Sequence, residues 1–348
     1  MDYEQNNNHT EPFNPQPIPN VMQGSPSVEK TRQKHTGWKI FWGITLILSV
    51  LANIALFLML IGLVAVFLAG QESMLTEEVI QPGPRTCKIA IITIEGIIDG
   101  EKSQDIYAQL SKARDDRLVK GLIIRVNSPG GTISASDQIC NEIRKYRQNE
   151  GKPVVAFMQG VAASGGYYVS VACDEIVAEP TVITGSIGVI AGHFVLQQLL
   201  EEKLGIQPAV FKSGEKKDWP SPFQPVTEQQ REYIQDKLIN PAYNRFVQVV
   251  VEGRDSLTID DVKRLADGSI YCAEEALKEK LIDEIGYLDE AVERIKVLAE
   301  IEKAHLVEYQ RPFSFSDLIR SQSTSMPKFD SSTLYELSTL QVLYLWTY

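Results

Sequence analysis

The pattern of hydrophobic and polar positions divides the chain into one long uncharged run and a region of short alternating segments. Residues 40–71 contain no Asp, Glu, Lys, Arg or His over 32 positions. A helix that spans a bilayer needs about 20 apolar residues, whereas a cleaved signal peptide has an apolar core of about 7–15 residues and a small-residue cleavage site. A run this long without a polar face is also untypical of a core helix. We therefore expect residues 38–70 to form an uncleaved transmembrane signal-anchor helix.

The charges that flank this run predict its orientation. Four basic residues precede it and three acidic residues follow it, namely Lys30, Arg32, Lys34 and Lys39, then Glu72, Glu77 and Glu78. By the positive-inside rule the N-terminus lies in the cytoplasm. Everything after residue 71 is then expected outside the cytoplasm.

Three other segments lack the pattern of a folded domain. Residues 1–37 are rich in Asn, Gln and Pro, and we expect them to be disordered. Residues 71–86 include a Pro-Gly-Pro sequence that predicts a linker. Residues 304–348 form a C-terminal tail that ends in an apolar stretch from Leu340 to Tyr348. That stretch could pack on the core, contact a neighbouring copy or lie in an active-site groove as a self-substrate, and we favour simple packing.

Residues 87–303 have the alternating pattern of an α/β domain. Three apolar, β-branched runs predict buried strands, at 89–94, 121–126 and 153–158. Helical segments are expected at 103–115, 134–147, 164–172, 227–252, 258–266, 273–279 and 288–299. Strands that alternate with helices predict βαβ units and a mainly parallel sheet. In such folds ligands bind at the carboxyl ends of the strands.

Composition narrows the possible functions. Hydrophobic residues make up 44% of the chain and charged residues 23%, which is typical of a folded protein. The net charge of −11 argues against nucleic acid as the main partner, because phosphate contacts need clustered Lys and Arg. The four cysteines (Cys87, Cys140, Cys173 and Cys272) have no metal-binding spacing, and we expect buried free thiols rather than disulfides.

Ser164 lies in a stretch of small residues directly after the third predicted strand. Its neighbours Ala163 and Gly165 leave room for a substrate carbonyl. The helix expected to begin here has free N–H groups that favour developing negative charge. Ser164 could therefore be a nucleophile, or it could be an ordinary helix N-cap.

A second glycine-rich turn follows the second predicted strand, at Ser128-Pro129-Gly130-Gly131. Two glycines allow backbone N–H groups to point into a cleft, as an oxyanion hole requires. An ordinary turn is the alternative. Two such elements, each at the end of a predicted strand, are more informative together than either one alone.

Few residues could deprotonate a serine nucleophile. Of the four histidines, His9 and His35 lie on the cytoplasmic side of the anchor, so only His193 and His305 remain. Lysine can act as the base when burial lowers its pKa, and Ser-Lys pairs are a known variant. The segment 212–218 contains three lysines, and spacing alone does not choose among them.

Together these residues resemble the signal peptide peptidase SppA family, single-repeat type, from about residue 88 to 299. The matching blocks are VNSPGG (126–131), AASGGYYV (162–169), TGSIGVI (184–190), KSGEKKDWPSPFQPVT (212–227) and IYCAEEALKEKLIDEIGYLDEAV (270–292). The resemblance implies a Clp protease/crotonase-like fold of repeated ββα units with a mainly parallel sheet. A crotonase-type acyl-CoA enzyme and an inactive membrane scaffold of the same fold are the alternatives.

The resemblance also implies roles for single residues. Ser164 would be the nucleophile, Lys217 its general base, and Ser186 the residue that orients the lysine amine. The oxyanion donors would be the N–H groups of Gly131 and Gly165. It further implies apolar peptides such as cleaved signal peptides as substrates, no metal or cofactor, a homo-oligomeric ring with grooves shared between neighbours, and anchoring in the bacterial cytoplasmic membrane.

Overall fold

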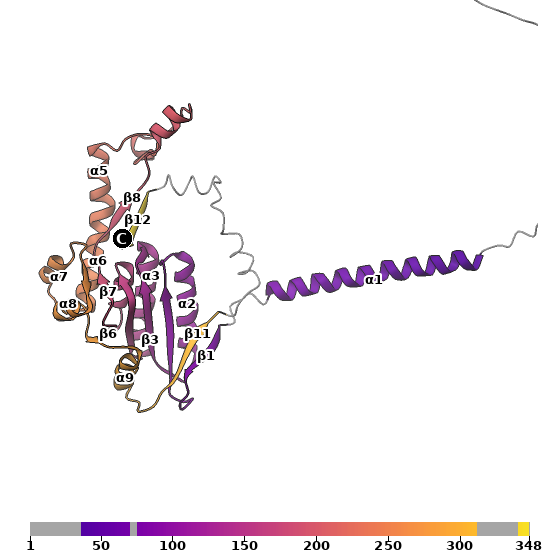
Figure 1. Cartoon of the computed structure of the whole chain (residues 1–348), viewed down its shortest axis with the longest axis horizontal. Helices are drawn as coiled ribbons and strands as arrows, with labels where there is room; N and C mark the ends of the chain where they lie inside the picture. Colours follow the sequence, from indigo (N-terminus) through magenta and orange to yellow (C-terminus); the bar gives the residue numbers. More distant parts are fainter. Residues whose placement is uncertain (1–35, 70–74, 312–339, 348) are drawn as a thin grey trace, which may run out of the picture. The chain divides into compact units, whose positions relative to one another are not determined.

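The computed structural model describes residues 36–69, 75–311 and 340–347 (Figure 1). The chain divides into two units, Met1–Ala69 and Gly70–Tyr348. Nearly all of the N-terminal segment that we expect to be disordered, residues 1–35, lies outside the described residues.

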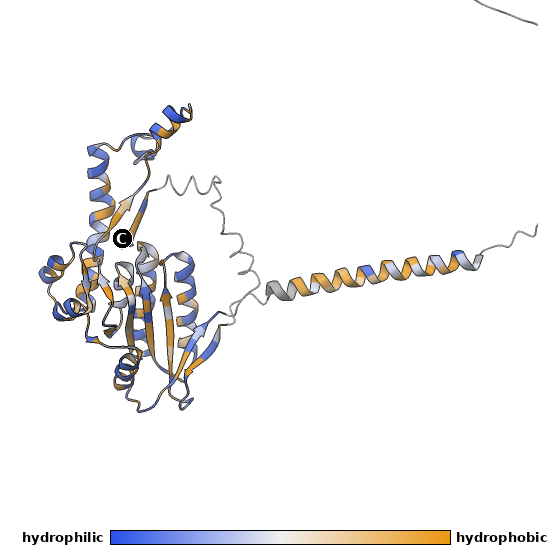
Figure 2. Cartoon of the chain, viewed as in Figure 1, coloured by the Kyte–Doolittle hydropathy of each residue, from blue (hydrophilic) through white to orange (hydrophobic). Residues whose placement is uncertain are grey.

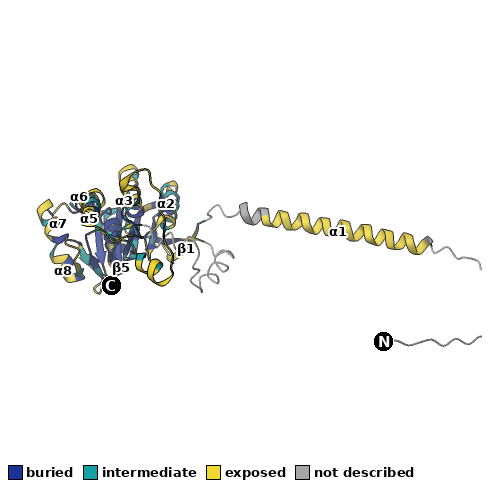
Figure 3. Cartoon of the chain, turned by 90° about the horizontal axis from the view of Figure 1, so that it is seen from above, coloured by how far each residue is buried: buried dark blue, intermediate teal, exposed yellow. Residues whose placement is uncertain are grey.

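The first unit contains a single described helix, α1 (Thr36–Ala69), which coincides with the predicted anchor. From Gly37 to Val64 its mean hydropathy is 2.7 and its residues are exposed (Figures 2 and 3). The side chain of Asn53 donates a hydrogen bond to the Ser49 carbonyl one turn earlier, at 2.7 Å, so this amide is partly satisfied within the helix. By length and composition the helix can cross a membrane.

The second unit is built around a mixed, mainly parallel sheet of nine strands, as predicted. The strands are β1 (Thr76–Gln81), β2 (Lys88–Glu95), β3 (Val119–Ser128), β5 (Val154–Ala163), β6 (Glu175–Ala178), β7 (Ile183–Gly185), β9 (Ile270–Cys272), β10 (Glu284–Ile285) and β11 (His305–Gln310). Their order is β1-β11-β2-β3-β5-β6-β10, with β7 paired to β5 and β9 paired to β7. Only the β1–β11 and β7–β9 pairs are antiparallel.

Helices cover both faces of this sheet (Figure 1). They are α2 (Gly100–Asp115), α3 (Ile133–Glu150), α4 (Gly165–Ser170), α5 (Glu228–Ile234), α6 (Asn240–Gly253), α7 (Ile259–Leu265), α8 (Ala273–Lys278) and α9 (Leu288–Leu298). One core packs the sheet against α2, α3, α4 and α6. A second, smaller core packs its other face against α9. The central strands are therefore buried on both faces, which explains their continuous apolar runs.

A small three-stranded sheet lies beside the main one. Its strands are β4 (Gly130–Thr132), β12 (Gln341–Leu345) and β8 (Ile190–Gly192), with β12 in the middle and antiparallel to both neighbours. The end of β4 also starts α3, because the Thr132 side chain accepts a hydrogen bond from the Ala135 N–H and so caps the helix. The glycine turn, the small sheet and α3 are thus fixed to one another.

Two of the expected segments contain β-strands. The expected linker, 71–86, contains β1, and the expected tail, 304–348, contains β11. These two strands form an antiparallel pair at the sheet edge. Every residue of β1 is exposed, so this strand has no hydrophobic alternation that would reveal it. The predicted long helix 227–252 is α5 and α6 joined by a π-helical turn.

All four cysteines lie in the described residues and none forms a disulfide. Cys140 and Cys173 are buried as expected, Cys87 is half-buried and Cys272 is exposed. Burial raises the pKa of the Cys140 thiol to about 11. The expectation of free thiols agrees with this structure, and the expectation of burial holds for two of the four.

Candidate active site

Ser164 lies between β5 and α4 in a strained backbone conformation. Its φ is 53° and its side chain is almost fully buried, with 1% of the residue exposed. A positive φ is uncommon in residues other than glycine and often occurs at functional sites. Its N–H donates to the Gly185 carbonyl at 2.8 Å, and its carbonyl accepts from the Tyr168 N–H at 2.8 Å. The hydroxyl does not cap α4, so the N-cap alternative does not account for this serine.

Ser186 is the register neighbour of Ser164. Strands β5 and β7 are parallel with Ala163 opposite Gly185. Ser164 and Ser186, the residues that follow them, therefore lie next to each other at the ends of the two strands. Adjacent strands lie about 4.8 Å apart. Ser186 also has a positive φ, 50°, and its N–H donates to the Ser269 carbonyl at 2.7 Å. The structure therefore brings together the two serines that the sequence blocks place 22 residues apart.

The two glycine elements also meet. A Cβ added to Gly165 would lie 3.0 Å from the Gly130 Cα and 3.1 Å from the Gly131 nitrogen. The turn is held by a hydrogen bond from the Gly130 N–H to Ser128 Oγ, at 3.0 Å. Gly130 has a φ of 105° that side chains rarely adopt. The backbone N–H groups of Gly131 and Gly165 are thus neighbours, as two donors to one oxyanion must be.

These elements open on a cleft of about 640 Å³. Its walls come from the segment after β7, β8, η3 (Gln235–Ile239), α6, the loop after α7 and the C-terminal residues. They include Ser164, Ser186, Val189, Ile190, Tyr243, Asp267, Leu345, Trp346 and Thr347. Hydrogen bonds from Ser269 hold the pKa of the Asp267 carboxyl below its ordinary value, so this group is an anion at neutral pH. The cleft thus combines apolar walls with one fixed negative charge.

Lys217 does not reach this cleft within the chain. It lies in the short 3₁₀ helix η2 (Glu215–Asp218) and is exposed, and none of the described residues that line the cleft is a lysine. Lys212 pairs with Asp218 at 2.7 Å, and the Lys216 ammonium lies over the ring of Tyr233 at 4.8 Å. The Lys217 ammonium has no such partner among the described residues.

The two remaining histidines are not at the cleft either. His305 begins β11, where its Nδ1 accepts a hydrogen bond from the Gly83 N–H at 3.2 Å. His193 lines a neighbouring pocket with Arg231 and Leu340. Neither is among the described residues that line the cleft with Ser164.

Sequence reasoning missed two residues at this site. Asp267 reaches the cleft from the loop after α7, and only its Asp-Gly-Ser turn sequence could have marked it. Tyr344 is fully buried within β12, although it lies in the segment that we expected to be a tail. It packs on the core, which is the alternative that we favour for this segment from the sequence. It also lies against the candidate site.

The same region of the chain matches known peptidases. The model of peptidase family S49 matches residues 146–302, and the model of the Clp protease family matches residues 76–179. A protein of Enterococcus faecium provisionally named signal peptide peptidase SppA is 37% identical over 262 residues, which cover 72% of this chain and 74% of that protein. The chain belongs to the SppA family of S49 peptidases.

Other relatives agree with this family. Protease 4 of Haemophilus influenzae is 37% identical to this SppA-family chain over 218 residues, 61% of the chain and 35% of the relative. Among solved structures, an asparagine-to-aspartate variant of ClpP1 from Listeria monocytogenes is 18% identical, with a TM-score of 0.40 over 58% of this chain and 94% of that one. The protein is thus a serine peptidase by family, with a Clp protease-like domain. Helix α1 and the SppA relatives indicate a membrane-anchored protein.

Proposed function

We propose that this protein is a membrane-anchored serine endopeptidase that cleaves apolar peptides through an acyl-enzyme. The observation that carries the proposal is the geometry at Ser164. Its hydroxyl lies in the cleft on a strained backbone, and the N–H groups of Gly131 and Gly165 are neighbours beside it. Strain of this kind is a feature of nucleophiles held on sharp turns.

The mechanism follows from these positions. Ser164 Oγ attacks the peptide carbonyl carbon while the base takes the hydroxyl proton. The carbonyl oxygen becomes an oxyanion that accepts hydrogen bonds from Gly131 and Gly165. The C–N bond then breaks, the leaving amine takes the proton from the base, and water hydrolyses the ester to restore Ser164.

We assign the base to Lys217, delivered from a neighbouring copy of the chain. Of the three lysines in its loop, Lys212 is ion-paired and Lys216 lies over aromatic rings, whereas Lys217 has no described partner. The surrounding segment exposes several large apolar side chains (Phe194, Leu199, Leu204, Ile206 and Phe211). Exposed apolar patches of this kind mark interaction surfaces. In an assembled ring this segment would be covered, and Lys217 would meet Ser186, its orienting residue, in the next cleft.

The proposed substrates are apolar peptides, including cleaved signal peptides, which the name of the Enterococcus faecium relative suggests. Val189, Ile190 and Tyr243 give the cleft apolar walls that suit them. The charge asymmetry around α1 supports an N-terminus in the cytoplasm and a peptidase domain outside it, in the bacterial cytoplasmic membrane.

Ser164→Ala tests the nucleophile. The full-length variant in detergent should lose at least about 1,000-fold in kcat/KM on a fluorogenic apolar peptide, because the covalent route is closed. Ser256→Ala, an exposed serine before α7, is the matched control and should keep full activity. Cleavage by the folded Ser164→Ala variant at the rate of the parent would overturn the proposal and favour an inactive scaffold with a contaminating activity.

The base is tested by pairing variants. Lys217→Ala should be inactive and Lys216→Ala active. Co-expression of Ser164→Ala with Lys217→Ala chains should restore activity, since some clefts then combine an intact serine with an intact lysine from the neighbour. If the co-assembled chains stay inactive, the lysine does not come from another copy.

A further inference from the structure

The backbone conformation of Ser164 depends on contacts with other elements. A positive φ such as its 53° is strained and persists only where the surrounding structure imposes it. Helix α4, which begins at the next residue, has six residues and no side-chain cap, and a helix this short is not stable by itself. The Tyr168 N–H donates to the Ser164 carbonyl at 2.8 Å. The contacts that hold Tyr168 therefore also hold the candidate nucleophile.

Two tyrosine hydroxyls bind α4 to other parts of the domain. Tyr167 donates to the Leu281 carbonyl at 2.9 Å, and Tyr168 donates to Asp137 Oδ1 at 2.5 Å. A hydrogen bond to a carboxylate is roughly twice as strong as one between neutral groups. Tyr168 is fully buried, so its hydroxyl is shielded from competing water. The bond to Asp137 is therefore the stronger of the two.

Asp137 also lies near both proposed oxyanion donors. It is in the second turn of α3, the helix that starts directly after β4 and Gly131. A Cβ added to Gly165 would lie 2.6 Å from Oγ of Ser136, the residue next to Asp137, so the starts of α3 and α4 are in contact. The hydrogen bond from Tyr168 joins the same two helices one turn after Gly165. It thus fixes the two donors relative to each other.

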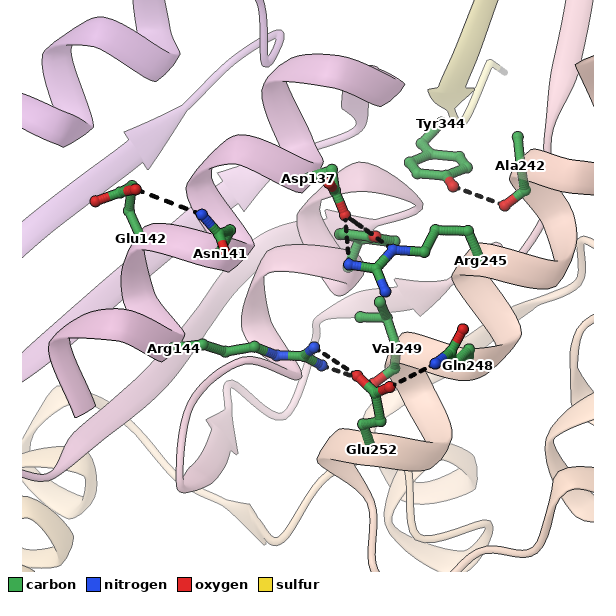
Figure 4. Close-up of polar contacts among 11 residues, drawn as sticks. Asp137, Asn141, Glu142, Arg144, Ala242, Arg245, Gln248, Val249, Glu252 and Tyr344 are labelled. Carbon is green, nitrogen blue, oxygen red and sulfur yellow. Dashed lines mark hydrogen bonds and ion pairs between the residues drawn. The ribbon is translucent and has the colours of Figure 1, made fainter. Parts of the chain in front are cut away.

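Arg245 of α6 holds the Asp137 carboxylate in place. The oxygen that accepts from Tyr168 also accepts from Arg245 Nε and Nη2, at 3.1 and 3.0 Å (Figure 4). Three donors on one oxygen fix the orientation of the carboxylate. Both members of this ion pair are half-buried, and partly exposed ion pairs contribute little to the stability of a fold. Loss of the pair should therefore affect the position of α4 more than folding.

A second ion pair joins the same two helices. Arg144 of α3 donates to Glu252 of α6 at 2.6 Å and to the Val249 carbonyl at 3.3 Å (Figure 4). Arg144 lies two turns after Asp137, and Glu252 lies two turns after Arg245, so the two pairs share the same helix faces. Among the described residues, neither Arg144 nor Glu252 bonds to α4. The two pairs thus differ in whether they reach the nucleophile.

We propose that Asp137 is a positioning residue for the peptidase reaction. By accepting the hydrogen bond from Tyr168, it holds the nucleophile and the two oxyanion donors in the geometry that attack requires. The inference rests on the proposed function for the identity of the nucleophile. Because a displacement of about 1 Å can cost about 100-fold in rate, loss of this bond should lower kcat by about 10- to 100-fold. KM should change little, since Asp137 is not among the described residues that line the cleft.

Three variants isolate the hydrogen bond. Tyr168→Phe removes only the hydroxyl and keeps the ring contact with Phe246, whose centroid lies 5.0 Å away. Asp137→Ala removes the acceptor, whereas Asp137→Asn keeps an acceptor oxygen. The first two should lower kcat on a fluorogenic apolar peptide, and the third should keep most of it. The double variant Tyr168→Phe,Asp137→Ala should be no slower than the slower single variant, because both changes break the same bond.

The reactivity of Ser164 is measured separately from peptide binding. The full chain in detergent is treated with a fluorophosphonate: Ser164 Oγ bonds to phosphorus, fluoride leaves and the base takes the hydroxyl proton. The labelling rate at Ser164 is followed by mass spectrometry, for variants that keep the thermal unfolding transition of the parent. Tyr168→Phe and Asp137→Ala should each be labelled about 10- to 100-fold more slowly than the parent. A residue that only supports the fold would not change this rate in folded protein.

Glu252→Ala is the matched control, because it breaks the second ion pair between the same helices. It should be labelled at the rate of the parent. Parental labelling of folded Asp137→Ala would overturn the inference, and so would an equal loss in Glu252→Ala, since the α3–α6 pairs would then act only on the fold. A parent chain that is neither labelled at Ser164 nor active on the peptide would instead refute the proposed function, and the inference with it.

Discussion

Replacing Gly165 by alanine places a methyl group where the two glycine elements meet. The new Cβ would lie 2.6 Å from Ser136 Oγ, 3.0 Å from the Gly130 Cα and 3.1 Å from the Gly131 nitrogen. Ordinary contacts of a Cβ begin near 3.4 Å. Ser136 is fully buried and its hydroxyl donates to the Thr132 carbonyl at 3.0 Å, so it cannot simply turn away. Part of the displacement must therefore fall on the Gly130-Gly131 turn.

The expected cost follows from this displacement. Shifts approaching 1 Å at a catalytic site can cost about 100-fold in rate, and loss of one oxyanion donor costs about 100- to 1,000-fold, or roughly 2.7–4 kcal/mol of transition-state stabilisation. We expect kcat to fall within that range while KM changes little, since the oxyanion forms only in the transition state. Overpacking should also lower the free energy of unfolding by about 1–3 kcal/mol.

The assay is cleavage of a fluorogenic apolar peptide by the full chain in detergent, with thermal unfolding followed in parallel. Gly100→Ala is the matched control, because a Cβ at that position meets nothing within 4 Å. Adding Ser136→Ala to Gly165→Ala removes the closest contact and should recover part of the loss. A folded Gly165→Ala variant with the kcat of the parent would refute the assignment of the oxyanion donors.

Three further predictions concern stability and reactivity. Arg254 is buried and donates hydrogen bonds to both carboxylate oxygens of Asp283, at 2.7 and 2.8 Å. Asp283→Ala should therefore lower the free energy of unfolding, measured in urea, by about 3 kcal/mol. This is the lower end of the range for breaking a buried ion pair, because Asp283 is partly exposed. Burial alone would raise the pKa of Asp116, but hydrogen bonds led by that from Lys88 hold it below 3.8. The stability that the ionised Asp116 carboxylate contributes is therefore present above about pH 4 and is lost as pH falls through the lowered pKa. When the free energy of unfolding is measured against pH, Asp116→Asn should reduce its fall on the acid side. Cys140, whose pKa burial raises to about 11, should resist iodoacetamide at pH 8 until the protein is unfolded, as measured by mass spectrometry.

Much of the fold could be predicted because the central strands are buried on both faces. The runs at 89–94, 121–126 and 153–158 correspond to β2, β3 and β5, since strands of this kind are continuously apolar. The edge strand β1 is exposed throughout and carries polar residues, so its sequence does not differ from that of a linker. Pairing of β1 with β11 joins segments more than 200 residues apart, and no local pattern encodes it.

The positions of the candidate site residues could be predicted to the extent that these residues follow strand ends. Gly131 and Ser164 lie in the small-residue segments that follow the predicted strands 121–126 and 153–158, and the carboxyl ends of parallel strands share one edge of the sheet. Ser186 follows β7, a strand of three residues, and could be identified only through family resemblance. The position of Lys217 stays a prediction, because it lies on an exposed segment whose surroundings are not provided by the single chain.

Strand β12 and the residues after it contribute Leu345, Trp346 and Thr347 to the cleft. Because β12 is covalently connected to the chain, a free peptide must compete with it for that position. A tethered segment acts at an effective concentration on the order of millimolar, independent of how dilute the protein is. A free peptide must exceed that level, scaled by the ratio of the two affinities, before it displaces β12 from half of the clefts. If the cleft cleaves apolar peptides as proposed, peptides below that concentration would leave β12 in place, so the length and sequence of the chain would set the peptide concentration at which cleavage begins.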